Sequence, residues 1–338
     1  VALLTSGTVT ATLASGTAAE LNAALTETSA NAWTLTVSGT SASLADLNAL
    51  NGKTSVTIPV GSLTGVTGTA AELTALLGGQ TTLTAAPGFS SFDGNETITL
   101  TGTVTAADAN MAAAATTGIV TATIEPGTAV AIIATLTDAS ATDALTITLT
   151  DTTVLAIDLS NLDGKTSVAV NAASLVTVEG SVAELQAAYT AGVAGLGSKA
   201  IDVMGGAISA ADANTVLGLT TGAVRATVTA DTAANLNAGL MGASGADALS
   251  LAVTGTATAA DLIALAGKTS VTVDATGVNN INGTVAELQA LYTLGASEIT
   301  GLGNENVDIA GGSSAAQANA AALLTSGVVT ATLQPGTV

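Results

Sequence analysis

The chain has 338 residues, of which 48% are hydrophobic, 1% aromatic and 9% charged, and its formal net charge at pH 7 is −20. This acidity disfavours binding to nucleic acid and to anionic membrane surfaces, because both are themselves negatively charged. Cysteine and histidine are absent, which excludes disulfides, thiolate chemistry, imidazole bases and the usual zinc sites.

The hydrophobic residues do not form a membrane-spanning segment. Mean hydropathy is +0.60, but Thr, Gly, Asn and Asp interrupt every apolar run well short of the roughly 18 residues that a spanning helix needs. We therefore expect a soluble chain without membrane insertion. Since aromatic residues are so few, its core must be thin and filled by Ala, Val and Leu.

Internal repetition is the strongest signal in the chain. The segment "GTVTATLASGTAAEL" at 7–21 returns as "GIVTATIEPGTAVAI" at 118–132, "GAVRATVTADTAANL" at 222–236 and "GVVTATLQPGTV" at 327–338. The starts of these segments are 111, 104 and 105 residues apart. The expected organisation is the end of a preceding repeat at 1–6, repeat 1 at 7–117, repeat 2 at 118–221, repeat 3 at 222–326, and the start of repeat 4 at 327–338.

Both ends of the chain lie in the same phase of this pattern, since "ALLTSG" occurs at 2–7 and again at 322–327. We expect a piece of a longer protein that continues into further copies or meets another molecule head to tail. An exposed strand edge at 327–338 would favour association, and salt would promote it by screening the negative charge.

Each copy divides into four units of one pattern, a Thr/Val alternation, a turn and a short Leu/Ala run. In "TVTATL", Val9, Ala11 and Leu13 would face one side of a strand and the threonines the other. Segments 97–101 and 145–150 repeat this alternation. The chain should therefore hold about thirteen strand–helix units.

Each helix should begin at a capping box, in which Ser or Thr caps a backbone N–H and an acid three residues later bonds back. Leucines three or four residues apart follow, as in Leu73, Leu76 and Leu77, and give each helix one apolar stripe. The pairs with this spacing are Thr17/Glu20, Ser43/Asp46, Thr69/Glu72, Thr105/Asp108, Ser181/Glu184, Ser209/Asp212, Thr258/Asp261, Thr284/Glu287 and the amide version Ser314/Gln317.

Alternating strands and helices joined by short loops predict an α/β fold with parallel strands. A doubly wound sheet or barrel would need longer helices, whereas similar units of 20–30 residues stack into a solenoid. We therefore expect a repeat solenoid with one parallel β-strand and one short helix per turn. Val9, Ile119, Val224 and Val328, or their immediate neighbours, should occupy equivalent buried places.

The segment "GKTSV" occurs at 52–56, 164–168 and 267–271 and resembles the end of a phosphate-binding loop. Such a loop needs a glycine five residues earlier and must start a helix, whereas here those positions are Leu47, Leu159 and Leu262 and the motif follows a helix. We expect the glycines to cap the helix C-termini and the lysines to complement the helix dipoles.

Two loops contain clustered oxygen ligands. The enlarged loop at 79–97 contains Phe89, Phe92, Asp93, Asn95 and Glu96, and "GLGNENVDI" at 301–309 is a weaker case. Calcium could be held by such oxygens, but an Asp-Gly turn fixed by two aromatic rings uses the same residues. We favour the turn.

The Thr-x-Thr rows allow a second interpretation, because regular threonines on a flat parallel sheet can order surface water, as in some ice-binding solenoids. The simpler reading is that Thr suits the exposed face of a strand. Arg225 interrupts one row, and Trp33, Tyr189 and Tyr292 are too scattered for a sugar-stacking platform.

The segments "GTVAELQALYTLGASEITGLGNENVDI" and "LDGKTSVAVNAASLVTVEGSVAELQAAY" resemble tandem repeats of very large secreted or cell-surface proteins of bacteria, especially marine cyanobacteria. The resemblance covers essentially the whole chain and implies an extracellular structural or adhesive protein that forms a fibre, filament or surface layer. The alternative is an ice- or glycan-binding solenoid that uses its Thr-lined face.

We expect no enzymatic activity, because no nucleophile–base pair can be assembled without His, Cys or a convergent Lys. No catalytic residue, cofactor-binding residue or metal ligand is predicted, and no cofactor is expected. The expected partners are further copies of the repeat, with surface glycans as an additional possibility.

Overall fold

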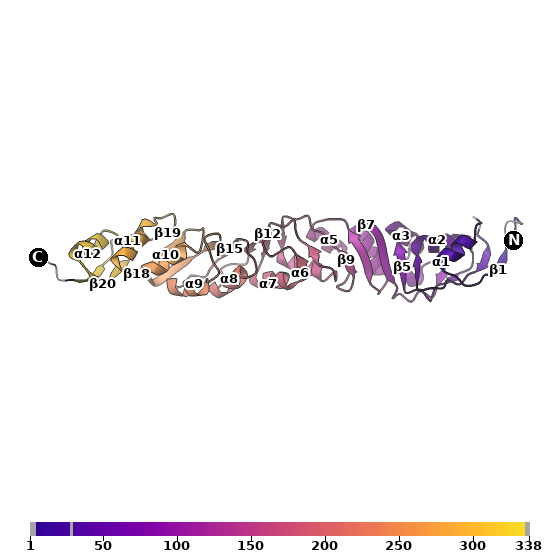
Figure 1. Ribbon diagram of the computed structural model, residues 1–338, viewed down its shortest axis with the longest axis horizontal. Helices are drawn as coiled ribbons and strands as arrows, with labels where there is room; N and C mark the ends of the chain where they lie inside the picture. Colours follow the sequence, from indigo (N-terminus) through magenta and orange to yellow (C-terminus); the bar gives the residue numbers. More distant parts are fainter. Residues whose placement is uncertain (1–4, 28–29, 335–338) are drawn as a thin grey trace. The chain divides into compact units, whose positions relative to one another are not determined.

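The computed structural model describes residues 5–27 and 30–334, and this part of the chain is a mixed α/β structure (Figure 1). It contains twelve α-helices, four in each expected copy. The segment from residue 327 contributes a strand but no described helix. The helices are α1 (Ala18–Ala24), α2 (Leu44–Lys53), α3 (Ala70–Leu77), α4 (Ala106–Ala115), α5 (Ala129–Thr135), α6 (Ala156–Asp163), α7 (Val182–Thr190), α8 (Ala210–Leu217), α9 (Ala233–Gly239), α10 (Ala259–Ala266), α11 (Val285–Thr293) and α12 (Ala315–Ala322).

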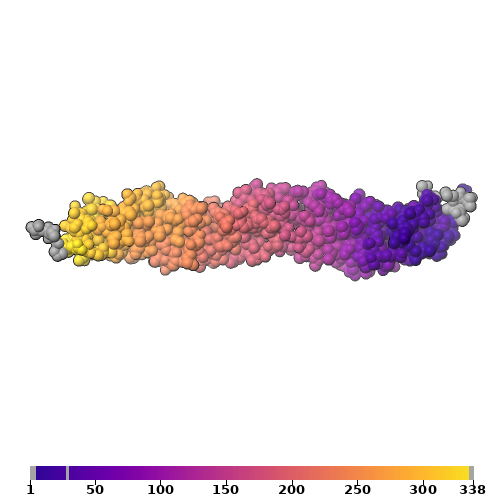
Figure 2. Space-filling model, in the orientation of Figure 1, coloured from indigo at the N-terminus to yellow at the C-terminus, as the bar shows by residue number. Residues whose placement is uncertain are grey.

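The chain divides into two compact regions whose boundary falls inside the second expected copy. The first region comprises Val1–Asp151, Asp158–Ser174 and Ala191–Ala194, and the second comprises Thr152–Ile157, Leu175–Thr190 and Gly195–Val338. Within each region, surface colours follow one another in sequence order (Figure 2). Segments that are neighbours in the sequence are therefore neighbours on the surface of their region.

The first region contains one five-stranded sheet and three strand pairs, all of them parallel. The sheet follows chain order, in the sequence β3 (Ser41–Ser43), β5 (Gly65–Gly68), β7 (Thr97–Val104), β8 (Val120–Ile124) and β9 (Ala144–Thr146). The pairs are β1 (Thr10–Thr12) with β2 (Ala32–Thr34), β4 (Ile58–Pro59) with β6 (Phe89–Ser90), and β11 (Val170–Asn171) with β13 (Val193–Ala194).

The second region contains two five-stranded parallel sheets. One runs β10 (Thr153–Leu155), β12 (Thr177–Gly180), β14 (Ala200–Val203), β15 (Val224–Thr227) and β16 (Ala248–Ser250). The other runs β17 (Ala252–Thr258), β18 (Val273–Gly283), β20 (Asn306–Ser313) and β21 (Val329–Leu333), with β19 (Ile299–Thr300) also beside β18. Every strand pair described in the two regions is parallel, as the sequence predicts.

The expected alternation along the strands is present. Leu145, Ile147 and Leu149 are buried, while Thr146 and Thr150 are exposed. The helices add their predicted apolar stripe, since leucines of α3 and α10 are buried and α10 packs against β17 and β18 (Figure 1). The core of each region is accordingly a layer of aliphatic side chains between strands and helices.

Burial at the repeat starts follows the prediction only in part. Val224 and Val120, the neighbour of Ile119, are fully buried, whereas Ile119 itself is 47% exposed. Val9 is half-buried and Val328 is 68% exposed. The physical reason is strand pairing, because β8 and β15 each have two neighbouring strands, whereas β1 and β21 have one each within the described residues.

A bulge precedes some of the helices. Gly102 in β7 and Gly255 in β17 have φ angles of +78°, a conformation open to glycine at no steric cost. The pairing register shifts between Thr99 and Thr103 on β7 and beside Gly255 on β17. The helix cap follows three residues after each glycine, so the bulge leads the chain out of the sheet into the helix.

Among residues 5–27 and 30–334, no helix has the length and apolarity needed to cross a bilayer.

Candidate functional site

The threonine of each Gly-Lys-Thr-Ser segment is a buried structural residue. Thr54, Thr166 and Thr269 are 3–6% exposed, and Thr166 Oγ1 donates to the carbonyl oxygen of Leu145 at 2.7 Å. Thr269 makes the same bond to Leu249 at 2.7 Å. Each hydroxyl also accepts from the backbone N–H two residues later at 3.0 Å. These hydroxyls therefore join one strand–helix unit to the unit before it.

The lysines of these segments bind backbone carbonyls rather than an open loop. Lys53 Nζ donates to Leu25, and Lys268 Nζ donates to Leu240 at 2.6 Å. Leu25 and Leu240 are the C-caps of α1 and α9, so each of these lysines binds the C-terminus of the preceding helix. Lys53 also lies in the last turn of its own helix, as predicted. Lys165 makes a longer bond of 3.5 Å to Thr137.

The glycines of the segments take the predicted C-cap role only in part. Gly267 ends α10 with φ −74°, and Gly52 lies within α2. The prediction is therefore confirmed for Gly267, which is the C-cap of α10. It is wrong for Gly52, because α2 continues to Lys53 and Thr54 is its C-cap. The segments lie at or just after helix C-termini, whereas a phosphate-binding loop precedes a helix N-terminus.

Two buried aspartates, which the sequence did not single out, repeat one arrangement. Asp143 and Asp247 are both 4% exposed. Asp143 accepts from the backbone N–H of Val120 at 2.8 Å, and Asp247 accepts from Val224 at 2.9 Å. Their second oxygens accept from the backbone N–H three residues earlier at 2.8 and 2.9 Å. A Ser three residues before an Asp, at 140–143 and 244–247, was the available signal.

Two buried glutamates hold turns in the same way. Glu96 is 1% exposed and accepts from Asp93 N–H at 2.8 Å and Gly94 N–H at 3.0 Å. Glu305 is 2% exposed and accepts from Gly303 N–H at 2.7 Å and from the Tyr292 hydroxyl. Burial, together with the nearby Glu305 carboxylate, raises the pKa of Tyr292 above its usual value.

The candidate calcium ligands of the enlarged loop are used within the turn. Glu96 faces backbone amides, Asp93 Oδ1 accepts from Asn95 N–H at 2.9 Å, and Asn95 Oδ1 accepts from the Thr117 hydroxyl at 2.6 Å. Among the described residues, no group of three acidic side chains is placed to hold a metal ion. The two rings at 89 and 92 are buried against each other, with centroids 5.9 Å apart, so this loop is an Asp-Gly turn anchored by aromatic packing.

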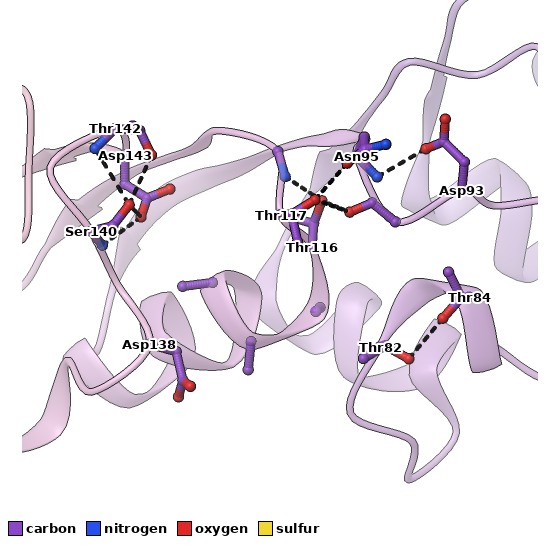
Figure 3. Close-up of a pocket in the computed structure, with 15 residues that line it drawn as sticks. Thr82, Thr84, Asp93, Asn95, Thr116, Thr117, Asp138, Ser140, Thr142 and Asp143 are labelled. Carbon is purple, nitrogen blue, oxygen red and sulfur yellow. Dashed lines mark hydrogen bonds between the residues drawn. The ribbon is translucent and has the colours of Figure 1, made fainter.

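The same loop borders a polar groove of about 670 Å³ in the first region (Figure 3). Ala113 and Ala114, near the C-terminal end of α4, line it together with polar side chains. The hydroxyls of Thr82 and Thr84 are hydrogen-bonded to each other at 3.0 Å, and those of Ser140 and Thr142 at 2.8 Å. We call this feature the α4 groove, and its polar rim side chains are Thr82, Thr84, Asp93, Asn95, Thr116, Thr117, Asp138, Ser140, Thr142 and Asp143.

No protein-family model matches the chain and no curated protein matches it. Among solved structures, a similar chain is the leucine-rich-repeat ectodomain of the Arabidopsis receptor kinase HAESA in complex with a peptide hormone ligand. It is 12% identical, with 84% of this chain and 54% of that chain covered and a TM-score of 0.21. This chain thus spans about half the length of that ectodomain, and a likeness of this size carries no argument about fold or function.

Proposed function

We propose that the chain is a repeat solenoid that serves as a structural segment of an extracellular cell-surface protein forming a fibre, filament or surface layer. The observation that carries this proposal is a set of hydrogen bonds that recurs from copy to copy. The bonds from Thr166 and Thr269 join residues 21 and 20 positions apart. The bonds of Asp143 and Asp247 both join residues 23 positions apart.

Sequence separations of 20, 21 and 23 residues between hydrogen-bonded partners are about the length of one strand–helix unit. Stacking of one unit on the next produces such separations. Successive helices contact each other from α1 to α5 in the first region and from α7 to α12 in the second. In a repeat array each unit buries the open face of its neighbour. A further copy of the same repeat therefore fits such a face, and such copies are the partner that we propose.

The proposed role is non-enzymatic and is supported by the use of the charged side chains. Lys53 and Lys268 bind helix C-termini, and the buried acids bind backbone amides. The remaining acidic residues would keep a surface fibre soluble through mutual repulsion. The resemblance to repeats of bacterial cell-surface proteins supports the extracellular location.

Antibodies raised against the folded chain provide a direct test on intact cells that produce the protein. Surface labelling without permeabilisation is the expected result, and electron microscopy should show the label on fibres or on a continuous layer. Labelling that requires permeabilisation would refute the extracellular role. An antibody against a cytoplasmic protein of the same cells controls for leakage.

A second candidate, binding to ice or to a glycan surface, is favoured by one observation in the first region. Thr67, Thr99 and Thr121 lie in register on β5, β7 and β8, and Thr123 pairs with Thr146 of β9 two residues further along. In the second region the outward column contains Glu179, Asp202 and Arg225 instead. Of these two sheets, as far as the structure describes them, only the one in the first region has this row of threonines.

Inhibition of ice recrystallisation tests this second candidate. If the threonine columns bind ice, the wild-type chain should inhibit recrystallisation and the Thr121→Lys, Thr123→Lys variant should not, since both side chains are exposed on β8. A wild-type chain without inhibition would exclude ice binding by this face.

A further inference from the structure

The two sheets that begin at β3 and at β10 keep their strands in chain order, so their outermost strands are also the first and the last in the sequence. In the second region the chain enters one sheet at β10, passes through β12, β14 and β15, and leaves it at β16. The sheet of the first region runs in the same way from β3 to β9. Tension applied to the two ends of such a segment therefore passes through every strand interface in turn.

The bonds at these interfaces lie along the direction of such tension. Hydrogen bonds in a parallel sheet run from each strand to its neighbour, and the interfaces are short. Ile201 and Asp202 of β14 pair with Val224 and Arg225 of β15, and the helices α8 and α9 contact each other beside them. A few hydrogen bonds and one helix contact thus hold this unit to the next. One interface can therefore separate while the covalent chain and the other interfaces stay intact.

The length of chain that one such separation releases is nearly constant. Paired residues are 24 positions apart between β10 and β12, and 23 positions apart at each of the next three interfaces. In the first region the separation is 32 positions between β5 and β7, because the connection from α3 to β7 spans residues 78–96. Separation of two paired strands frees only the chain between them, so the released length is that of one unit.

From this arrangement, we propose that the chain is an extensible tether, whose strand–helix units separate one at a time under tension and restack when the tension falls. Restacking is local, because paired residues of adjacent units are only 23 or 24 positions apart in the β10–β16 sheet, and contacts at short sequence separation form quickly. The neighbouring unit, which stays folded, offers the strand edge on which the freed strand pairs again.

This extensibility deepens the structural role proposed above and rests on it only for the source of the tension. A surface fibre built from such units lengthens under drag before any covalent bond is loaded to breaking. Denaturant differs from tension, because it weakens all interfaces at once, whereas tension separates the weakest interface first.

Stretching of single chains in optical tweezers tests the proposal. The chain contains no cysteine, so one cysteine added at each end attaches it to two DNA handles. An extended residue spans about 3.3–3.6 Å and neighbouring strands lie about 4.8 Å apart, so most steps should add about 70–80 Å of contour length. The separation of β5 from β7 should add about 100–110 Å. Lowering the force should restore the same lengths step by step.

Insertion of about ten Gly and Ser residues between Gly205 and Gly206 identifies one step. Both glycines are exposed, and a Cβ added to either would meet no atom within 4 Å, so the connection from β14 to α8 has room for a longer loop. Only the step of the β14–β15 interface should lengthen, by about 35 Å. The matched control has the same insertion between Gly79 and Gln80, where only the β5–β7 step should lengthen.

Release of a whole five-stranded sheet in one event would overturn the proposal, because the strand interfaces would then fail together. Insertions that leave every step unchanged in folded variants would overturn it as well. The steps of the wild-type chain decide the question even if an insertion variant does not fold. Because the measurement uses purified chains, absence of surface labelling on cells would refute the extracellular role and leave stepwise extension standing.

Discussion

The buried hydroxyl of Thr166 has no unused hydrogen-bonding capacity. It donates to the carbonyl oxygen of Leu145, and it accepts from the N–H groups of Leu145 and Val168 at 3.0 Å each. Val has nearly the same shape but neither donates nor accepts. We expect Thr166→Val to lower the free energy of unfolding by about 1–3 kcal/mol, because it leaves buried backbone groups unpaired.

Denaturant unfolding followed by circular dichroism measures this change. Thr146→Val makes the same substitution on the exposed face of β9 and should change the free energy by less than about 0.5 kcal/mol. Equal effects of the two substitutions would mean that the buried hydroxyl does not hold adjacent units together.

The capping glutamates make stability dependent on pH. In the capping boxes of α1, α7 and α11, hydrogen bonds from the backbone N–H and then from the side chain of the cap residue lower the pKa of Glu20, Glu184 and Glu287. The folded state therefore favours the ionised form. The stabilisation of the folded state by these ionised glutamates is fully present above the ordinary Glu pKa of 4.5. It is lost as the pH falls through their lowered pKa values. The free energy of unfolding should thus decrease on acidification below this value.

Replacing these three glutamates by glutamine separates titration from hydrogen bonding. The natural pair Ser314/Gln317 shows that an amide can fill the role, since Gln317 Oε1 accepts from the Ser314 N–H at 2.9 Å. The triple variant should lose less stability than the wild type between about pH 5 and pH 3. Urea unfolding at a series of pH values measures how the free energy of unfolding of the wild type and of the triple variant changes with pH. The same pH dependence in both proteins would contradict the role of the three glutamates.

At the scale of elements, local sequence specifies where each helix begins. All nine predicted pairs lie at helix N-termini, and in each the backbone N–H of the later residue donates to the Ser or Thr hydroxyl. At Ser43, Ser209 and Thr258 the predicted return bond from the acid to the cap N–H is not formed, and the cap hydroxyl donates to the carboxylate instead. These helices are too short to persist alone, so the cap acts together with packing.

Removing one complete cap should loosen one helix. Thr69→Ala combined with Glu72→Ala deletes a reciprocal pair of bonds of 2.8 and 3.2 Å at the start of α3. The expected cost is about 1–2 kcal/mol, with faster hydrogen exchange over residues 69–77. Thr74→Ala, in the middle of the same helix, should have a smaller effect on exchange. Unchanged protection in the double variant would mean that the cap does not stabilise this helix.

At the scale of the whole molecule, an entire copy should be removable. Deletion of residues 118–221 joins Thr117 to Gly222 and recreates the wild-type sequence Thr-Thr-Gly. Thr116 and Thr220 already occupy matching positions, since each hydroxyl donates to a carbonyl at 2.6 Å and accepts from a glycine N–H at 2.9 Å. The shortened chain should fold and unfold cooperatively, with a denaturant m-value about two thirds of the wild-type value because less surface is exposed on unfolding.

Deletion of 118–232 is the matched control. It removes a similar length but also β15, so that α4 is followed by α9 without a strand between them. This chain should lose cooperative unfolding, which circular dichroism and urea titration can measure. Failure of both deletions to fold, or equal stability of both, would contradict the proposed stacking of equivalent units.

Much of the fold was predictable because its signals are local. The alternation at 145–150, the capping pairs and the leucine stripes each depend on residues within about four positions of one another, which is the range of strand and helix periodicity. The copies and the parallel pairing followed from repetition of those signals. The partners of Lys53 had no comparable local signal, and the local spacing of Ser140 and Asp143 did not indicate that Asp143 would bind Val120 of the adjacent unit.

The sequence by itself determined the period of the copies, the class of the fold and the starts of the helices, because short-range spacing sets them. Only the tertiary structure decided that Lys53 binds the end of the preceding helix, that Asp143 and Thr166 bond across adjacent units, and that the 78–96 connection borders a groove. These contacts join residues 20 or more positions apart. Such distances are fixed by the register of paired strands, which no local pattern in one unit specifies.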